Sequence, residues 1–248
     1  MGLFRLWWVP QDAGAAEPTR SKAAEGTYVS YDSDALLGVL ALEAVRAGAL
    51  VVGEDLGTVE PRVRTDLDAT GVLGSAVLWF ERDEKSGDFL PPDQWRELAL
   101  ATVTTHDLPT AAGFLVEEHV RVRHELGQLG LPLDQEQART REERAQLLEM
   151  LTGSGLLEAA RDNEVLAMHA ALVASPSRLV LAAFGDAVGD VRQPNLPGTV
   201  DQYPNWRLPV ADGRGRPMLL EQLLASDGVR RLTRLLREGV GPGALPVR

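Results

Sequence analysis

The sequence contains no cysteine, and only two of its 25 basic residues, Lys22 and Lys85, are lysines. The absence of cysteine excludes disulfide bonds, thiolate metal sites and cysteine nucleophiles. No segment approaches the roughly 18 to 20 consecutive apolar residues of a membrane-spanning helix. The N-terminal apolar run is interrupted by Arg5 and ended by Pro10, and no small-residue cleavage site follows. This pattern is not that of a signal peptide, so we expect a cytoplasmic protein.

Basic residues are outnumbered by acidic ones, and the formal net charge of the 248 residues is -11. An acidic balance disfavours nucleic acid and anionic membrane surfaces as partners, but it is neutral toward uncharged ligands such as sugars. The sequence also lacks a phosphate-binding glycine loop, a nucleophile-elbow serine and a zinc-protease motif.

Short apolar runs alternate with helical patterns along the chain. The runs that predict buried strands are residues 50–52, 75–80, 98–104 and 179–184. The patterns that predict helices are residues 35–46 with caps at Asp34 and Gly48, a second helix from Thr58 to about Ala69, a short helix from Asp93, a long stretch over 110–174 broken near 127–133 and 153, and residues 218–237. This alternation predicts a parallel α/β fold.

The number of strands limits the possible architectures. A closed eight-stranded barrel takes about 250 residues and eight strands. This chain has the length but shows only four predicted strands, because the helical stretch after Asp107 occupies the remainder. The sheet is therefore either open or completed by another segment.

Polar clusters at residues 53–57, 105–107 and 193–199 lie in loops after predicted strands. Such loops carry the active sites of parallel α/β folds. Glu54 and Asp107 follow apolar runs, and paired carboxylates suit glycosidic bond cleavage, metal binding or phosphoryl transfer. Each could instead be a helix cap or an ion-pair partner. Similarly, Trp79 and Trp206 could stack on sugar rings or fill a core.

Taken together, these segments resemble the amylomaltases, the 4-alpha-glucanotransferases of glycoside hydrolase family 77 in the alpha-amylase clan. The segments that carry the resemblance are residues 2–10, Gly26-Thr27-Tyr28-Val29, residues 36–43, Gly53-Glu54-Asp55-Leu56-Gly57, residues 101–110, residues 193–199 and Asn205-Trp206-Arg207. The resemblance implies the C-terminal half of a TIM-type (β/α)8 barrel, spanning residues 1–248 as one partial catalytic domain. A helical insertion would occupy approximately residues 115–174.

The resemblance also implies roles for individual residues. Glu54 falls on the family's general acid/base, and Asp107 falls on an aspartate that stabilises the transition state. His106 would hydrogen-bond the reacting sugar. The other residues expected to bind substrate are Trp79, Asn195, Pro197, Gly198, Asn205 and Trp206. The implied substrates are alpha-1,4-glucans and maltooligosaccharides. The implied reaction is retaining transglycosylation, which needs no metal or organic cofactor.

One element of the family pattern is missing from the sequence. The nucleophilic aspartate of the family lies in an Arg-x-Asp-His segment just before the motif that begins here at Gly2. We therefore expect the isolated chain to be inactive, and its exposed apolar faces to cause self-association unless an N-terminal half of the barrel covers them.

Two other readings stay open. The chain could be a glucan-binding or decayed half domain without catalysis, in which case it binds glucan without turnover. It could also be a hydrolase of the same clan that uses a different carboxylate of this chain, such as Asp55 or Asp186, in which case it releases reducing sugar without lengthening glucans.

Overall fold

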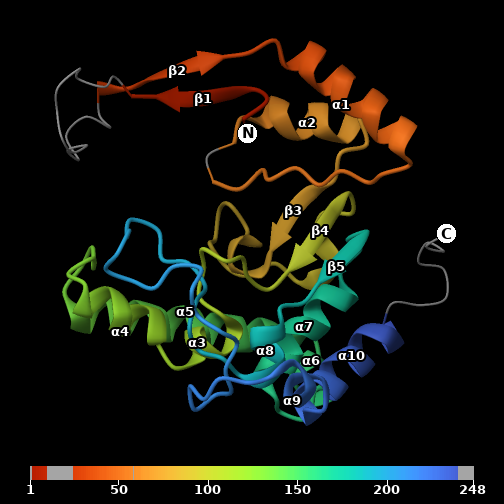
Figure 1. Cartoon of the computed structure of the whole chain (residues 1–248). Helices are drawn as coiled ribbons and strands as arrows, with labels where there is room; N and C mark the ends of the chain where they lie inside the picture. The colour runs from red at the N-terminus through yellow and green to blue at the C-terminus, as the bar shows by residue number, and fades with distance from the viewer. Residues whose placement is uncertain (1, 10–24, 58, 240–248) are drawn as a thin grey trace. The chain divides into compact units, whose positions relative to one another are not determined.

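Two units make up the chain, residues 1–75 and residues 76–248. The computed structural model describes residues 2–9, 25–57 and 59–239. Figure 1 shows the elements of both units along the chain. Thr58, which was expected to cap the second helix, lies outside the described residues.

An antiparallel pair of strands opens the first unit. Strand β1 (Arg5–Trp8) pairs with β2 (Thr27–Ser30) in a register that runs from Arg5 opposite Ser30 to Trp8 opposite Thr27. The rings of Trp7 and Tyr28 meet edge to face, with centroids 4.8 Å apart. Aromatic cross-strand pairs of this kind stabilise a two-stranded ladder. The sequence analysis did not predict these strands, because the run lacks alternation of apolar and polar residues.

Two helices follow in the first unit. Helix α1 (Ser33–Ala47) ends at Gly48, which has a φ of 60° and is the C-cap that the sequence predicted. Its N-cap is Asp32 rather than Asp34, because the Asp32 carboxylate accepts the Ala35 amide. Helix α2 (Pro61–Ala69) begins with proline, which needs no amide partner in a first turn. The buried side chains that hold the two helices together are Leu37, Val63, Leu67 and Val72.

The segment 50–52 does not form the predicted strand. It makes a single parallel bridge between Val52 and Leu73, in which the Leu73 amide donates to the Val51 carbonyl at 3.0 Å. Val52 remains 39% exposed, so the burial that the apolar run suggested is incomplete.

A three-stranded sheet in the order β3-β4-β5 leads into the second unit. The strands are β3 (Gly74–Val77), β4 (Ala99–Thr102) and β5 (Leu179–Leu181). The pairing of β4 with β5 is parallel, as predicted, with Leu100 opposite Leu179. The predicted strand 75–80 ends early, because a 3-10 helix begins at Leu78. A second 3-10 helix (Pro92–Gln94) replaces the short helix predicted from Asp93.

Helices of the second unit contribute buried side chains to the same core as this sheet. They are α3 (Ala111–Leu115), α4 (Glu118–Glu125), α5 (Leu133–Gly153), α6 (Leu156–Ala159), α7 (Glu164–Ala174), α8 (Phe184–Val188), α9 (Leu220–Leu224) and α10 (Asp227–Gly239). The breaks predicted near 127–133 and 153 separate α4 from α5 and α5 from α6. Buried Leu147 and Leu151 of α5 pack with Met168 and Leu172 of α7 in one cluster. The predicted helix 218–237 is split between α9 and α10.

The architecture is therefore mixed α/β with small, open sheets. Helix α7 is largely buried, since all residues from Ala167 to Leu172 are buried. No helix among the described residues is long and apolar enough to cross a membrane.

Helix α3 approaches a neighbouring backbone so closely that it requires glycine. A Cβ atom added to Gly113 would overlap the Val191 carbonyl. We expect Gly113→Ala to lower the free energy of unfolding by about 1–3 kcal/mol, because the neighbour is backbone and cannot rotate away. Urea unfolding measures this change. Gly153→Ala is the matched control: nothing lies within 4 Å of its added methyl group, so a similar loss there would contradict this explanation.

Candidate functional site

Asp107 stands in a tight turn that follows β4. The Thr104 hydroxyl donates to the Pro109 carbonyl at 2.7 Å, and the Asp107 amide donates to the Thr105 hydroxyl oxygen at 3.3 Å. The turn is therefore closed by the threonines that the sequence places before the acid. The Asp107 side chain is 45% exposed, so its carboxylate can reach a ligand.

Asn195, 88 positions further along the chain, contacts this carboxylate directly. Its side-chain amide donates to Asp107 Oδ1 at 2.6 Å, and its backbone amide donates to the His106 carbonyl at 3.1 Å. His106 Nε2 lies 3.5 Å from the same Oδ1 atom. A hydrogen bond to an ionised carboxylate is about twice as strong as a neutral one, so Asn195 fixes which oxygen of Asp107 is engaged.

Trp206 provides an exposed aromatic surface beside His106. The two ring centroids are 4.8 Å apart and the planes meet at 47°. Trp206 is 67% exposed and has a φ of 61°, a left-handed conformation that is unusual for a bulky side chain. Its amide donates to the Pro194 carbonyl at 3.0 Å. Strain of this kind persists only where the surroundings impose it, and it concentrates at functional sites.

The loop between Asn195 and Trp206 is braced by Asn205. Asn205 Oδ1 accepts the Leu196 amide at 2.8 Å, and its Nδ2 donates to the Thr199 hydroxyl oxygen at 2.8 Å. Both polar ends of Asn205 therefore serve the loop itself. Pro197 and Gly198 lie exposed within the same loop, and Gly198 has a φ of 82°.

Trp79 does not join this group. Its ring packs against Phe114, with centroids 4.6 Å apart, beside the main hydrophobic core. Its Nε1 atom is buried and has no hydrogen-bond partner among the described residues. These contacts are those of a core side chain, and contact with a sugar stays a prediction for Trp79.

Glu54 belongs to the first unit, where its neighbour Asp55 shapes the turn. Asp55 is 3% exposed and its Oδ1 accepts the Ser75 amide at 2.8 Å. The Gly53 amide donates to the Leu73 carbonyl at 2.7 Å. Glu54 lies between these two anchored residues and is itself exposed. Adjacent acids thus have different surroundings: Asp55 supports the backbone, and Glu54 faces outward.

Two residues that the sequence analysis did not single out support the loop. Gln193 is 6% exposed, and its amide donates to the Asp107 carbonyl at 3.1 Å and to the Asn195 carbonyl at 2.6 Å. The Tyr203 hydroxyl donates to the Gln193 carbonyl at 2.7 Å. Burial raises the pKa of the Tyr203 hydroxyl above its usual value. The sequence analysis identified the segment 193–199 as a polar cluster. It could not predict the contact of Gln193 with Asp107, because residues 86 positions apart leave no local pattern.

The site therefore combines an exposed carboxylate with a fixed amide partner, an imidazole and an exposed indole. A family profile described as 4-alpha-glucanotransferase, glycoside hydrolase family 77, matches residues 1–213. The chain belongs to this family.

Relatives of this chain agree with the profile. Proteins named 4-alpha-glucanotransferase from Mycobacterium tuberculosis and Haemophilus influenzae are 48% and 33% identical to it, over 96% and 83% of this chain. The amylomaltase of Corynebacterium glutamicum matches 95% of the chain with a TM-score of 0.83 and 37% identity. An amylomaltase from Streptococcus agalactiae, solved with acarbose, covers 96% of the chain with a TM-score of 0.59 at 18% identity, a likeness of fold alone.

The chain spans about a third of the length of these relatives. It covers 33% of the Mycobacterium tuberculosis protein and 34% of the Corynebacterium glutamicum structure.

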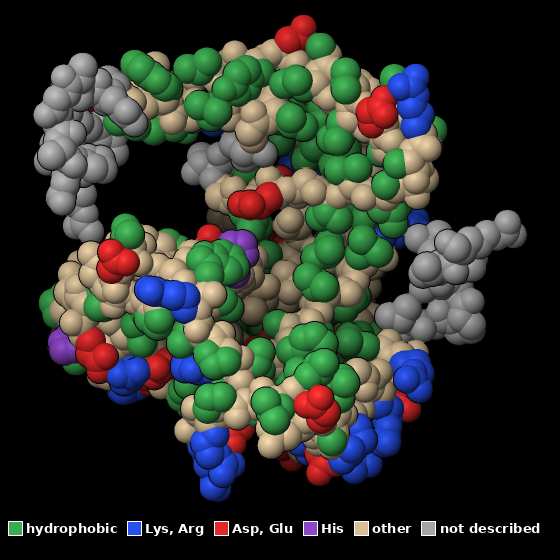
Figure 2. All heavy atoms as spheres, in the orientation of Figure 1, with side chains coloured by type: hydrophobic (Ala, Val, Ile, Leu, Met, Phe, Trp, Pro, Cys, Tyr) green, Lys and Arg blue, Asp and Glu red, His purple; other side chains and the backbone are tan. Residues whose placement is uncertain are grey.

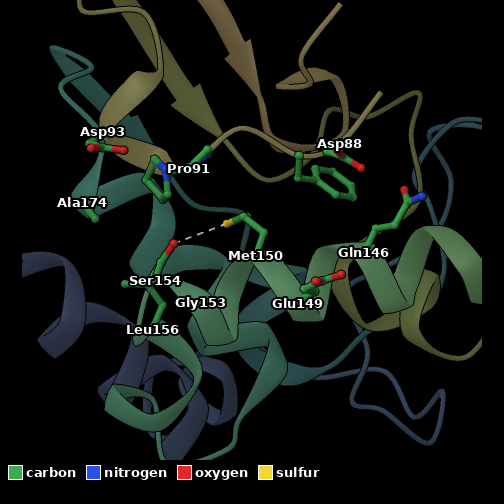
Figure 3. A pocket seen from close by; sticks show the side chains of 12 residues that line it. Asp88, Pro91, Asp93, Gln146, Glu149, Met150, Gly153, Ser154, Leu156 and Ala174 are labelled. Carbon is green, nitrogen blue, oxygen red and sulfur yellow. Dashed lines mark hydrogen bonds between the residues drawn. The ribbon is translucent and has the colours of Figure 1, made fainter. Parts of the chain in front are cut away.

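A separate hollow of about 690 Å³ lies elsewhere in the second unit of this family member. Figure 3 shows Asp88, Asp93 and Glu149 around it, with Met150 and Leu156 from the α5–α6 region. None of the predicted site residues lines it. Phe89, its aromatic residue, is 6% exposed and has the Arg82 guanidinium 3.7 Å from its ring centroid, so it offers no free face to a sugar.

The half-buried side chain of Tyr203 makes the site loop sensitive to alkali. We expect Tyr203→Phe to lower the free energy of unfolding at neutral pH by about 1 kcal/mol, because the Gln193 carbonyl loses its donor. Above about pH 10 the unfolded chain releases the Tyr203 proton before the folded chain does, so the native protein loses stability as the pH rises.

The phenylalanine variant lacks this alkaline loss, so the difference between the two proteins shrinks above pH 10. Urea titrations at a series of pH values measure both effects, with Tyr31→Phe in the first unit as the control. A constant difference at every pH contradicts the role assigned to the Tyr203 hydroxyl.

Proposed function

We propose that this chain forms part of a retaining 4-alpha-glucanotransferase that transfers alpha-1,4-glucan segments between maltooligosaccharides. The observation that carries the proposal is the Asp107 carboxylate, which Asn195 holds at 2.6 Å beside the exposed His106–Trp206 pair. An exposed indole offers the flat apolar surface on which a sugar ring stacks. Oriented hydrogen-bonding groups around it recognise hydroxyl groups.

The roles proposed for the residues are those that the family resemblance implies. Glu54 protonates the leaving glucan oxygen and then takes the proton from the 4-hydroxyl of the acceptor glucan, which replaces water. Asp107 is a fixed negative group, and it stabilises the positive charge that develops on the distorted sugar in the transition state. His106 and Trp206 bind the same sugar. This mechanism requires no metal or organic cofactor.

The attacking carboxylate is assigned to a part of the enzyme outside these 248 residues. Retaining transfer needs a nucleophile about 5 Å from the acid/base, and the family resemblance locates it in a segment before Gly2. In this proposal the isolated chain binds glucan but does not turn it over.

For the fold, we propose the C-terminal half of a (β/α)8 barrel, in which α4 to α7 form the helical insertion. The exposed side chains of the first unit support this, because they are unusually apolar: Leu6, Trp7, Trp8, Tyr28, Val29, Tyr31, Leu36, Val39, Leu42, Val45, Leu50 and Val52. Figure 2 shows hydrophobic side chains gathered over β2 and α1. A soluble protein rarely leaves so large an apolar face uncovered, so the N-terminal half of the barrel is its proposed cover.

One alternative has an observation in its favour. The Asp107, Asn195, His106 and Trp206 cluster is complete within the second unit, so this chain could bind glucans as a half domain without catalysis. The hydrolase alternative has no such support. Asp55 and Asp186 are buried, and each accepts a backbone amide, from Ser75 at 2.8 Å and from Ala111 at 2.9 Å.

A hybrid enzyme tests the activity. This chain replaces the matching third of the Mycobacterium tuberculosis relative, and the conversion of maltotriose to glucose and longer maltooligosaccharides is measured. We expect an active hybrid, and we expect Glu54→Gln and Asp107→Asn each to lower kcat by at least about 100-fold, because each removes a group that acts in the transition state.

Glu43→Gln is the matched control, since Glu43 forms an exposed ion pair with Arg46 on α1 and the change should leave kcat intact. If the hybrid is active and keeps its kcat with Glu54→Gln and with Asp107→Asn, the catalytic roles assigned to Glu54 and Asp107 are wrong. The isolated chain is assayed in parallel. Chain lengthening by this chain alone contradicts the placement of the nucleophile, and glucan binding without turnover by an inactive hybrid supports the half-domain alternative.

The apolar face of α1 gives a second prediction. We expect the isolated chain to self-associate, and we expect Val39→Glu combined with Val45→Glu to make it largely monomeric, because these side chains are 61% and 81% exposed. Sedimentation velocity over a range of concentrations measures the change. Leu219→Glu with Leu220→Glu is the control, at equally exposed leucines of the second unit. If the unsubstituted chain sediments as a monomer at every concentration, the proposal of a half barrel with an uncovered apolar face is contradicted.

A further inference from the structure

We propose that Gln193 is a positioning residue for Asp107, in that it sets the register between the Asp107 segment and the Asn195 segment. This inference rests on the proposed function, because it assumes that Asp107 contacts the reacting sugar. Gln193 itself faces neither the surface nor a ligand, since it is 6% exposed.

Four hydrogen bonds tie the two segments together, and their partners run in opposite order along the chain. Asp186 Oδ1 accepts the Ala111 amide at 2.9 Å, and the Thr110 hydroxyl donates to the Asp190 carbonyl at 2.7 Å.

Further along the same line, the Gln193 side chain donates to the Asp107 carbonyl at 3.1 Å, and the Asn195 amide donates to the His106 carbonyl at 3.1 Å. As the chain descends from Ala111 to His106, its partners ascend from Asp186 to Asn195. We call this set of four bonds the site seam.

Within the site seam, the Gln193 side chain bonds to the backbone carbonyls of both Asp107 and Asn195. Its single Nε2 atom donates one hydrogen to the Asp107 carbonyl and the other to the Asn195 carbonyl, at 3.1 and 2.6 Å. Because both neighbours are carbonyl oxygens, only the NH2 end of the amide can face them. The acid and the amide that orients its carboxylate are thus held by one side chain.

The surroundings fix Gln193 in turn. The Tyr203 hydroxyl donates to its carbonyl at 2.7 Å, and Gly113 lies against the Val191 carbonyl, where any side chain would collide. The site seam therefore cannot slide by a fraction of a residue without leaving buried carbonyls unpaired or forcing this contact. Precise placement of a fixed charge matters for catalysis, since errors near 1 Å can lower rates about 100-fold.

The experiment replaces Gln193 by Met, which keeps the length and removes both donors. In the 248-residue chain, we expect hydrogen exchange of the Asn195 backbone amide to accelerate about tenfold, since the seam opens beside it. In the hybrid enzyme described above, we expect kcat to fall about 10- to 100-fold while KM changes much less, because Asp107 acts mainly in the transition state.

A double-mutant cycle separates positioning from general stability. If Gln193 acts through the Asn195–Asp107 contact, Gln193→Met should lower kcat by less than about threefold in a chain that already carries Asn195→Ala. Gln146→Met is the matched control: Gln146 is a half-buried glutamine of α5 whose Oε1 accepts the Arg82 guanidinium at 3.1 Å, far along the chain from the seam. It should leave kcat and Asn195 exchange unchanged.

The outcomes are distinct. Full additivity in the cycle, or a lower melting temperature with unchanged kcat and exchange, overturns the proposal and leaves Gln193 a structural residue. If Gln193→Met does not fold, Gln193→Asn keeps the amide but shortens its reach, and it should show the same effects at smaller size. If the hybrid with native Gln193 is inactive, the proposed function fails, and the exchange measurement still decides whether Gln193 fixes the seam.

Discussion

The hydrogen bond from Asn195 to the Asp107 carboxylate is the interaction on which the site depends. It joins two loops separated by 88 positions, and it orients the Asp107 carboxylate, whose side chain is 45% exposed. The bond can form only because the backbones beneath it are held in register. The loop that bears Asp107 and the loop that bears Asn195 thus hold each other in place, although they come from different parts of the sequence.

The carboxylates of this chain fall into two physical classes, and burial separates them. Asp55, Asp186 and Asp190 are buried, and each accepts at least one backbone amide. A buried carboxylate with a backbone partner costs much to remove and cannot reach a substrate. Glu54 and Asp107 are exposed enough to meet a ligand. The sequence analysis selected acidic residues by their position after predicted strands. Position alone cannot distinguish the exposed Glu54 from the buried Asp55, because the two residues are adjacent.

The features that depend on neighbouring residues in the chain could be predicted from local sequence patterns. Gly48 was identified as a C-cap, because the left-handed conformation favours glycine, and the buried stretch of α7 and the parallel partner strand β5 followed from apolar runs. The pairing of β1 with β2 could not be predicted, because residues 10–24 separate the strands and neither alternates. Similarly, Trp79 looked like a candidate sugar platform, but its packing against Phe114 depends on helix α3, which lies more than thirty positions away.

The residues proposed to contact a ligand and the residues that hold them in place leave different traces in a sequence. His106, Asp107 and Trp206 were singled out by residue type and by their place in loops after predicted strands. Gln193 does not stand out, since a glutamine in a polar loop is unremarkable until its two carbonyl partners are seen. The strain at Trp206 makes the same point: its φ of 61° is invisible in the sequence, and it is tolerated only because the Pro194 carbonyl and the Asn205 brace fix the loop around it. A site of this kind can be located from its reactive residues, but its geometry is set by the supporting ones.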